Sequence, residues 1–195
     1  ASGCFDRIIV STDDDEIAAI AQAAGAEVPF RRPAELAGDY SPTNAVVVHA
    51  VEAIADAGRN VVQVACIYAT APFLTPEIVR EGMLVATTPG ADFSATVTRY
   101  PFPIQRALAV ANDGLLQPRE PDRILARSQD LGEYYHDAGQ LYCGAPASFA
   151  RFGSVFQAQV APVVLPRTHV VDIDTPEDWE MAEALFKAIR ERQHD

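Results

Sequence analysis

Hydrophobic and polar positions alternate in two different ways along the first half of the chain. Short apolar runs, typical of strands, occupy residues 7–11, 61–68 and 93–98. The second is unbroken enough to predict a central parallel strand that is covered on both faces. Between these runs the apolar positions recur at helical spacing, which predicts helices over residues 14–24, 43–57 and 76–86. Alternating strands and helices predict an α/β sheet with right-handed crossovers.

The middle of the chain, residues 100–137, departs from this rhythm. It is rich in proline and contains the turn sequence Asn112-Asp113-Gly114. Short alternating runs over residues 105–110 and 115–117 flank the turn, which predicts a β-hairpin. We therefore expect this segment to leave the main sheet as a small β-rich excursion.

The pattern of the first half returns near the C-terminus. Strands are predicted at residues 140–143, 160–165 and 170–173. A helix is then expected to run to about residue 192, because Thr175 suits its N-cap and Pro176 its first turn. Its predicted buried face consists of Trp179, Ala182, Leu185 and Phe186.

Composition and charge narrow the class of protein. The 195 residues, 49% hydrophobic, suit one globular domain over residues 1–195. The net charge of −12 argues against nucleic acid as a partner. No apolar run reaches the ~20 residues of a membrane span, and the first residues do not resemble a signal peptide. The three scattered cysteines form neither a disulfide framework nor a metal motif, which favours a reducing cytoplasm.

The segment with the clearest chemistry contains Asp172 and Asp174. If residues 170–173 form a strand, residues i and i+2 point to one side, so the two carboxylates would lie together at its end. Ligands of open α/β sheets bind at that edge, and paired carboxylates suit Mg²⁺ that also contacts a phosphate. The alternative is that both are exposed acids at a helix start.

Other polar residues lie where predicted strands meet helices. Asp13 could bind a metal, although with Glu16 it also fits a capping box, which we favour. Arg32 and Thr43 flank a long loop and suit an anion or the polar edge of a base. Tyr68 opens a segment of small residues that would let a ligand approach the backbone, or that forms a simple turn.

A dense polar and aromatic stretch covers residues 127–137. Arg127, Gln129 and the tyrosines near His136 suit a polyhydroxy carboxylic acid, and they would equally suit a protein–protein interface. His136 could be a base, although a single histidine beside Asp is more often structural. Gly-rich phosphate loops and the nucleophile motif GxSxG are both missing from the sequence, which gives no support to a hydrolase.

Four of these segments together resemble the CMP-sialic acid synthetase family. They are Phe5–Asp13, Arg32–Ala37, Tyr68–Phe73 and Asp172–Asp178, in this order and over essentially the whole chain. The third segment, with residues 127–140, is similar to the pseudaminic acid branch of that family. The resemblance implies a three-layer, doubly wound, mostly parallel α/β sheet like that of nucleotide-diphospho-sugar transferases.

The resemblance also implies a reaction and a set of roles. CTP and a nine-carbon sugar acid would give a CMP-sugar and pyrophosphate, with Mg²⁺ held by Asp172 and Asp174. Nucleotide-binding positions would be Asp13, Arg32 and Thr43. Sugar-binding positions would be Tyr68, Arg127, Gln129, Gln140 and Tyr142. The excursion at residues 100–137 would be a dimerisation arm that covers the substrate of a homodimer partner.

The sequence departs from the family at its beginning. The family opens with a strand and a Gly-, Arg- and Lys-rich loop that grips the triphosphate, and neither is present here. We expect the natural protein to be longer and active, and this chain alone to be nearly inactive. The alternatives are an enzyme for N-acylneuraminic or legionaminic acid, and an inactive protein that binds nucleotide or sugar.

Overall fold

The computed structural model describes residues 2–192, which divide into two compact units. The first unit comprises the described residues of Ala1–Ala95 together with Gln140–Val163. The second comprises Thr96–Gly139 and the described part of Val164–Asp195, so it contains the whole predicted excursion. The single domain over residues 1–195 stays a prediction.

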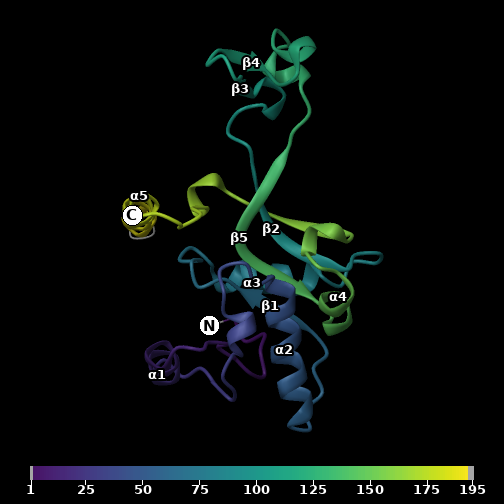
Figure 1. Ribbon diagram of the computed structural model, residues 1–195, viewed down its shortest axis with the longest axis vertical. Coiled ribbons are helices and arrows are strands. Elements are labelled where there is room, and N and C mark those ends of the chain that lie inside the picture. The colour runs from purple at the N-terminus through teal and green to yellow at the C-terminus, as the bar shows by residue number, and fades with distance from the viewer. Residues whose placement is uncertain (1, 193–195) are drawn as a thin grey trace. The chain divides into compact units, whose positions relative to one another are not determined.

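The predicted helices are present, each within a residue or two of its expected bounds. They are α1 (Asp15–Ala23), α2 (Thr43–Asp56), α3 (Pro76–Val85) and α5 (Pro176–Arg192), and the structure adds the short α4 (Pro146–Arg151), which lies beside α2 (Figure 1). Short 3-10 helices occupy Ala34–Leu36, Ile104–Arg106, Pro121–Arg123, Ser128–Asp130, Val155–Gln157 and Arg167–His169.

The cap of α1 differs from the expected one by a single residue. The Asp14 carboxylate, and not that of Asp13, accepts hydrogen bonds from the backbone N–H of Glu16 at 2.8 Å and of Ile17 at 2.9 Å. The capping box built on Asp13 is therefore wrong. Since Asp14 satisfies the orphan donors of the first turn, the Asp13 side chain is left for another role.

Four strands form the main sheet in the order β1 (Val64–Ile67), β5 (Tyr135–Gly144), β2 (Phe93–Arg99) and β6 (Val160–Leu165). β1 pairs with β5 in antiparallel orientation, with Ala65 opposite Cys143. In the part of the chain that the structure describes, β1 ends this order. Its expected place as a central parallel strand is therefore wrong, because an apolar run predicts burial and not the identity of the pairing strand.

Two further expected strands are not formed. Residues 7–11 contribute an isolated parallel bridge from Ile9 to Glu27, closed by Glu27 N–H to Ile8 O at 2.8 Å and Val10 N–H to Glu27 O at 2.9 Å. Residues 170–173 follow a 3-10 helix and remain irregular. Both are short β-branched runs whose strand formation depends on a neighbouring strand to pair with.

The hairpin in the excursion is confirmed, with shorter strands than expected. It consists of β3 (Leu108–Val110) and β4 (Leu116–Pro118), with Val110 opposite Leu116, while Gln105 belongs to a 3-10 helix. Gly114 in the connecting turn has φ of 81°, a conformation that glycine adopts without steric cost.

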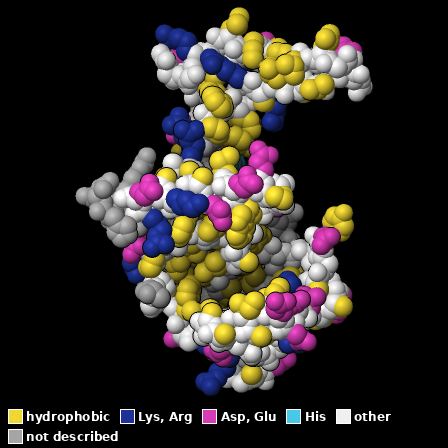
Figure 2. All heavy atoms as spheres, turned by 90° about the vertical axis from the view of Figure 1, so that its left-hand side faces the viewer, with side chains coloured by type: hydrophobic (Ala, Val, Ile, Leu, Met, Phe, Trp, Pro, Cys, Tyr) yellow, Lys and Arg dark blue, Asp and Glu magenta, His cyan; other side chains and the backbone are white. Residues whose placement is uncertain are grey.

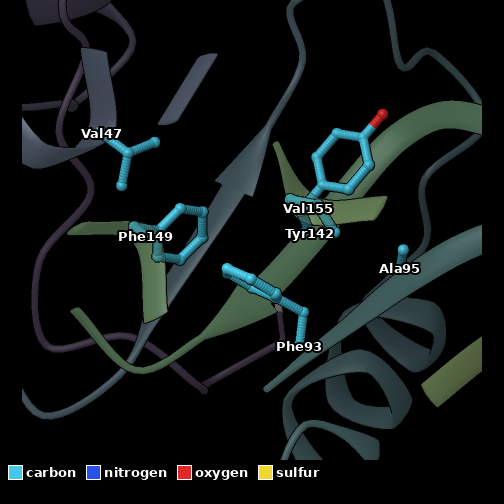
Figure 3. Close-up of a cluster of buried hydrophobic side chains, with 6 residues drawn as sticks. All are labelled: Val47, Phe93, Ala95, Tyr142, Phe149 and Val155. Carbon is cyan, nitrogen blue, oxygen red and sulfur yellow. The ribbon is translucent and has the colours of Figure 1, made fainter. Parts of the chain in front are cut away.

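The hydrophobic core of the first unit is built around two phenylalanines. The rings of Phe93 and Phe149 lie 4.9 Å apart, edge to face, and both side chains are almost fully buried. Figure 3 shows Tyr142 at the edge of this cluster, with its hydroxyl pointing away from the other labelled side chains. The core thus holds β2, β5, α2 and α4 together beneath the polar residues discussed below.

The Gly144→Ala substitution should destabilise this core. A Cβ at residue 144 would lie 2.6 Å from Phe93 Cδ1 and 3.0 Å from the Asp92 carbonyl oxygen. We expect the free energy of unfolding to fall by ~1–3 kcal/mol, as in other overpacked cores. Chemical denaturation measures the change, with Gly38→Ala as control because nothing lies within 4 Å of the place that its new methyl group would take. Equal stability of the two variants would contradict the packing described here.

The predicted buried face of α5 is only partly correct. Ala182 is buried, whereas Trp179 is 59% exposed and Phe186 is 42% exposed. The indole N–H of Trp179 donates to the Glu183 carboxylate on the next turn at 3.3 Å. Helical periodicity identifies an apolar face but not the surface that covers it. Among the described helices, none is both long and apolar enough to cross a membrane.

Candidate functional site

Four of the predicted site residues meet in the first unit. Thr43 is the first residue of α2, and its hydroxyl lies 2.6 Å from the hydroxyl of Tyr68, just after β1. The Tyr68 ring packs edge-on against Tyr142 at 5.3 Å, and the Tyr68 backbone N–H donates to the Gln140 carbonyl at 3.0 Å. These residues, which are far apart in the sequence, therefore form one polar cluster at the end of β1.

The strand β5 supplies the buried half of this cluster. Gln140 and Tyr142 are two residues apart on β5, so their side chains point to the same face of the sheet. Gln140 is fully buried, and Tyr142 is 4% exposed. A buried amide and a buried phenol require hydrogen-bonding partners, so these two residues bring polar groups into an otherwise apolar core.

Arg32 and Asp13 lie together in the same unit. The Arg32 Nη2 atom is 3.4 Å from Asp13 Oδ1, and the Arg32 backbone N–H donates to the Thr12 carbonyl at 3.0 Å. The Arg32 Nε atom is buried and has no hydrogen-bond partner among the described residues. The neighbouring Arg31 is instead engaged with Asp15. Arg32 thus keeps N–H groups available for an acceptor.

The two aspartates of the predicted metal site lie in the second unit, in the irregular segment before α5. Partial burial raises the pKa of the Asp172 carboxyl, and the negative charges of Asp174, Asp137 and Asp178 raise it further, while His136 opposes this. Asp137 comes from β5, so an element distant in sequence adds to the negative potential. The described residues contain no group of three or more His, Cys, Asp or Glu side chains arranged as a metal cage.

Asp172 and Asp174 are both exposed, as the helix-start alternative expects, but the acid that bonds the start of the helix is Asp178. Its carboxylate accepts hydrogen bonds from the Thr175 hydroxyl at 2.7 Å, from the Thr175 N–H at 2.9 Å and from the Asp174 N–H at 3.2 Å. These bonds lower the pKa of Asp178. Asp178 therefore fixes the start of α5 and the backbone of Asp174, and the Asp174 carboxylate is not needed as the cap.

Arg127 and Gln129 lie in the excursion of the second unit, on the surface. The Arg127 guanidinium pairs with Asp130 three residues on, at 2.9 Å, and Gln129 is exposed within the same 3-10 helix. His136 is held by an edge-on contact with Tyr100 at 4.9 Å and by the Asp137 carbonyl at 2.8 Å from its Nδ1. These contacts are those of a histidine with a structural role, which is the interpretation that we favour over a catalytic base.

The predicted site residues are thus divided between the two units. The first unit holds Asp13, Arg32, Thr43, Tyr68, Gln140 and Tyr142. The second holds Arg127, Gln129, Asp172 and Asp174. Two contributors were not predicted: Thr12, a buried residue bonded to Arg32, and Asp137 beside Asp172. Both lie in segments that the sequence marks, since Thr12 belongs to the Phe5–Asp13 motif and Asp137 to the polar aromatic stretch.

A groove of about 650 Å³ opens elsewhere in the first unit, between α2 and α4. It is lined by residues that include Leu36, Val48, His49, Glu52 and Phe152. The polar side chains described above are not among its lining residues. The side chains of Thr43 and Tyr68 are therefore not part of this groove, although Pro42 and Asn44, which flank Thr43, line it.

Comparison with known proteins identifies the class. A family model described as cytidylyltransferase matches residues 1–99. The chain is 35% identical over 190 residues to the pseudaminic acid cytidylyltransferase of Campylobacter jejuni subsp. jejuni serotype O:2, covering 97% of this chain and 82% of that protein. It is 26% identical to the CMP-N,N'-diacetyllegionaminic acid synthase of Legionella pneumophila, again covering 97% of this chain and 82% of the relative.

Solved structures share the fold. CMP:2-keto-3-deoxy-manno-octonic acid synthetase, in complex with CTP, superposes with a TM-score of 0.62 at 14% identity, over 95% of this chain and 83% of the other. A 4-diphosphocytidyl-2C-methyl-D-erythritol synthase superposes with a TM-score of 0.57 at 15% identity, over 94% and 84%. The fold is that of nucleotidyltransferases, as predicted. The chain belongs to the cytidylyltransferase family, which confirms the resemblance found in its motifs.

Proposed function

We propose that this enzyme transfers the cytidylyl group of CTP to pseudaminic acid, a nine-carbon sialic-acid-like sugar acid, and releases pyrophosphate. The observation that carries the proposal is the 35% identity, over 97% of the chain, to the Campylobacter jejuni pseudaminic acid cytidylyltransferase. N-acylneuraminic or legionaminic acid is the alternative substrate, which the 26% identity to the Legionella synthase keeps open.

In the proposed reaction the anomeric hydroxyl of the sugar acid attacks the α-phosphorus of CTP. The new P–O bond forms as the bond to the β-phosphate oxygen breaks, and pyrophosphate leaves with those electrons. The proton of the anomeric hydroxyl passes to solvent. Asp13, Arg32 and Thr43 bind the nucleotide, whereas Tyr68, Gln140, Tyr142, Arg127 and Gln129 bind the sugar acid. These residues contribute mainly by orienting the two reactants, because the chemistry needs no protein nucleophile.

Asp172 and Asp174 fit a magnesium ion as its protein ligands. Partial burial, and after it the negative charges of Asp174 and Asp137, raise the pKa of Asp172, so a cation between the carboxylates would relieve an existing repulsion. Two carboxylates leave further coordination positions for water and phosphate oxygens, which is how Mg²⁺ is commonly held. When bound, the ion supplies neutralisation of the triphosphate charge. The two carboxylates would hold its position.

We also propose that full activity needs an upstream segment with a strand and a cationic phosphate loop. β1 ends the strand order of the described sheet, and Ile67 on it is 44% exposed. Ile8, in the bridge that replaces the first expected strand, is 59% exposed. One more strand added beside these segments would cover such exposed apolar groups. An inactive protein that binds nucleotide or sugar is the alternative for the chain alone.

The hairpin of the excursion supports a homodimer. Residues directly opposite in an antiparallel pair share a face, so Leu108, Val110, Leu116 and Pro118 lie on one side of it. The side chains of Leu108, Val110 and Leu116 are 52%, 71% and 63% exposed. In Figure 2 hydrophobic side chains gather on the surface of this segment, at the top of the view. We propose that a second copy covers this apolar face.

Charging that face should dissociate the dimer. The double substitution Val110→Asp and Leu116→Asp is expected to weaken self-association at least ~100-fold, since two buried apolar side chains become unpaired charges. Sedimentation over a range of concentrations measures the change. Gln117→Asp, on the opposite face of the hairpin, is the control and should leave the association state unchanged. A wild-type protein that is monomeric throughout would contradict the proposed dimer.

The substrate assignment is tested by competition among sugar acids. Pyrophosphate release from CTP and Mg²⁺ is measured with pseudaminic, legionaminic and N-acetylneuraminic acids in parallel. We expect the highest kcat/KM with pseudaminic acid. A clear preference for another acid would overturn the substrate assignment but leave the proposed reaction in place.

We further propose that the enzyme works in the cytoplasm, which its free thiols at Cys4, Cys66 and Cys143 support.

A further inference from the structure

We propose that Tyr68 acts as a positioning residue for Thr43, and that this contact links binding of the nucleotide to the residues assigned to the sugar acid. The inference rests on the proposed function, in which Thr43 binds the nucleotide and Tyr68 the sugar. The hydroxyl groups of Thr43 and Tyr68 lie 2.6 Å apart in a partly buried position. We call these two groups the hydroxyl pair.

The hydroxyl pair has one proton to offer a ligand. Each hydroxyl carries a single hydrogen and can donate once, and the 2.6 Å contact uses one of the two hydrogens whichever oxygen donates. Among the described residues the pair makes no other hydrogen bond. The second O–H can therefore donate to an acceptor from outside the chain. A carbonyl, carboxylate or phosphate oxygen fits this requirement.

Thr43 is not occupied as a helix cap. The N-cap residue of α2 is Pro42, and no side chain caps that end of the helix. Threonine in the first turn would otherwise use its hydroxyl on the helix backbone, a common local arrangement. Here the hydroxyl turns to Tyr68 instead. Its orientation is therefore set by a residue from a different element, 25 positions away.

Tyr68 is rigid enough to perform this role. Its backbone N–H is bonded to the Gln140 carbonyl at 3.0 Å, and its ring lies edge-on to Tyr142 at 5.3 Å. The same ring packs against the buried core that includes Val47 of α2. Because the Tyr68 backbone is hydrogen-bonded and its ring is packed, its hydroxyl has little freedom to move. Tyr68 can therefore orient Thr43 at a low entropic cost.

If Tyr68 orients Thr43, a change at Tyr68 weakens the binding of CTP, although Tyr68 is assigned to the sugar acid. Removing only the phenol oxygen, with Tyr68→Phe, frees the Thr43 hydroxyl to rotate and to donate elsewhere. CTP should then bind about three- to tenfold more weakly even when no sugar acid is present, the range expected for one neutral hydrogen bond. A residue that contacted only the sugar acid would leave CTP affinity unchanged.

The test is calorimetric titration of CTP with Mg²⁺ into the longest natural form of the protein, without sugar acid. Four variants are compared with the wild type: Tyr68→Phe, Thr43→Val, the double variant and Thr43→Ser. We expect the double variant to bind CTP no more weakly than Thr43→Val, because both changes break one contact. Thr43→Ser keeps the hydroxyl and should bind within about twofold of wild type.

A matched control separates positioning from stability. Thr87→Val removes a threonine hydroxyl that donates to the Leu84 carbonyl at 2.7 Å, after α3, and should leave CTP affinity unchanged. Unaltered CTP binding by Tyr68→Phe, or additive losses in the double variant, would overturn the inference while the proposed function stands. A wild-type protein that binds no CTP would overturn both.

Discussion

Replacing Asp172 or Asp174 by asparagine should abolish the Mg²⁺-dependent formation of CMP-sugar. Each change removes a charged oxygen ligand, and we expect kcat/KM to fall at least ~100-fold, since removal of a single charge-stabilising group in an active site costs about that much. Rates are measured with both substrates at several Mg²⁺ concentrations. Added Mg²⁺ should restore only part of the activity.

Folding should survive these two changes. The pKa of Asp172 is raised in the folded protein, so its ionised form is less favourable there than in the unfolded chain. The ionised Asp172 carboxylate therefore destabilises the folded protein. This destabilisation is absent below the pKa that Asp172 has in the unfolded chain, and it is complete above the pKa that Asp172 has in the folded protein. Asp172→Asn removes it at neutral pH. The melting temperature should therefore stay the same or rise slightly.

Glu180→Gln is the matched control for both aspartates. It also removes one carboxylate charge from the second unit, at an exposed position on α5. Its activity should equal that of the wild type. Full activity in both Asp172→Asn and Asp174→Asn would contradict their role as metal ligands and would support the alternative that they are surface acids.

Arg32→Met should weaken CTP binding by about 10- to 100-fold, because hydrogen bonds to charged groups are worth ~1.5–3 kcal/mol. The Arg32 Nε is buried without a partner among the described residues, and its Nη2 lies at 3.4 Å from Asp13, at the long end of an ion pair. The guanidinium is thus held beside Asp13 and keeps N–H groups that can donate to a ligand. Arg32→Lys should recover little affinity, since lysine lacks the planar fork.

Arg31→Met provides the control for this prediction. Arg31 is adjacent in sequence and carries the same charge, but its guanidinium is bonded to Asp15 and to the Asp14 carbonyl at the start of α1. CTP affinity should change less than about twofold on its removal, because exposed ion pairs contribute little. Equal losses from Arg31→Met and Arg32→Met would indicate a general effect of positive charge and contradict a specific site at Arg32.

Local sequence signals predicted the helices and the hairpin well. Thr75 and Pro76 start α3, and Asn112-Asp113-Gly114 turns the hairpin, because caps and turns depend on a few neighbouring residues. The run at residues 61–68 correctly predicted a strand, but its place in the sheet depends on β5, more than 60 residues away. Strand pairing is not encoded locally, so the sequence could not supply it.

The same distinction applies to the candidate site. Asp172 and Asp174 were selected on the expectation of a strand that is not formed, and Asp178, not strand geometry, fixes the backbone beside them. The contact between Thr43 and Tyr68 joins the start of α2 to the residue after β1, which the sequence shows only as separate polar segments. Motif resemblance selected the candidate residues, whose roles stay predictions, whereas the contacts among them needed the folded chain.

The most direct test is ³¹P NMR of CTP, Mg²⁺ and pseudaminic acid incubated with the longest natural form of the protein, and in parallel with this chain. With the longer form we expect the three CTP resonances to be replaced by one phosphodiester resonance and by pyrophosphate, and with this chain almost no change. Persistence of CTP with both forms, or its conversion to CDP and phosphate, would contradict cytidylyl transfer to this sugar acid.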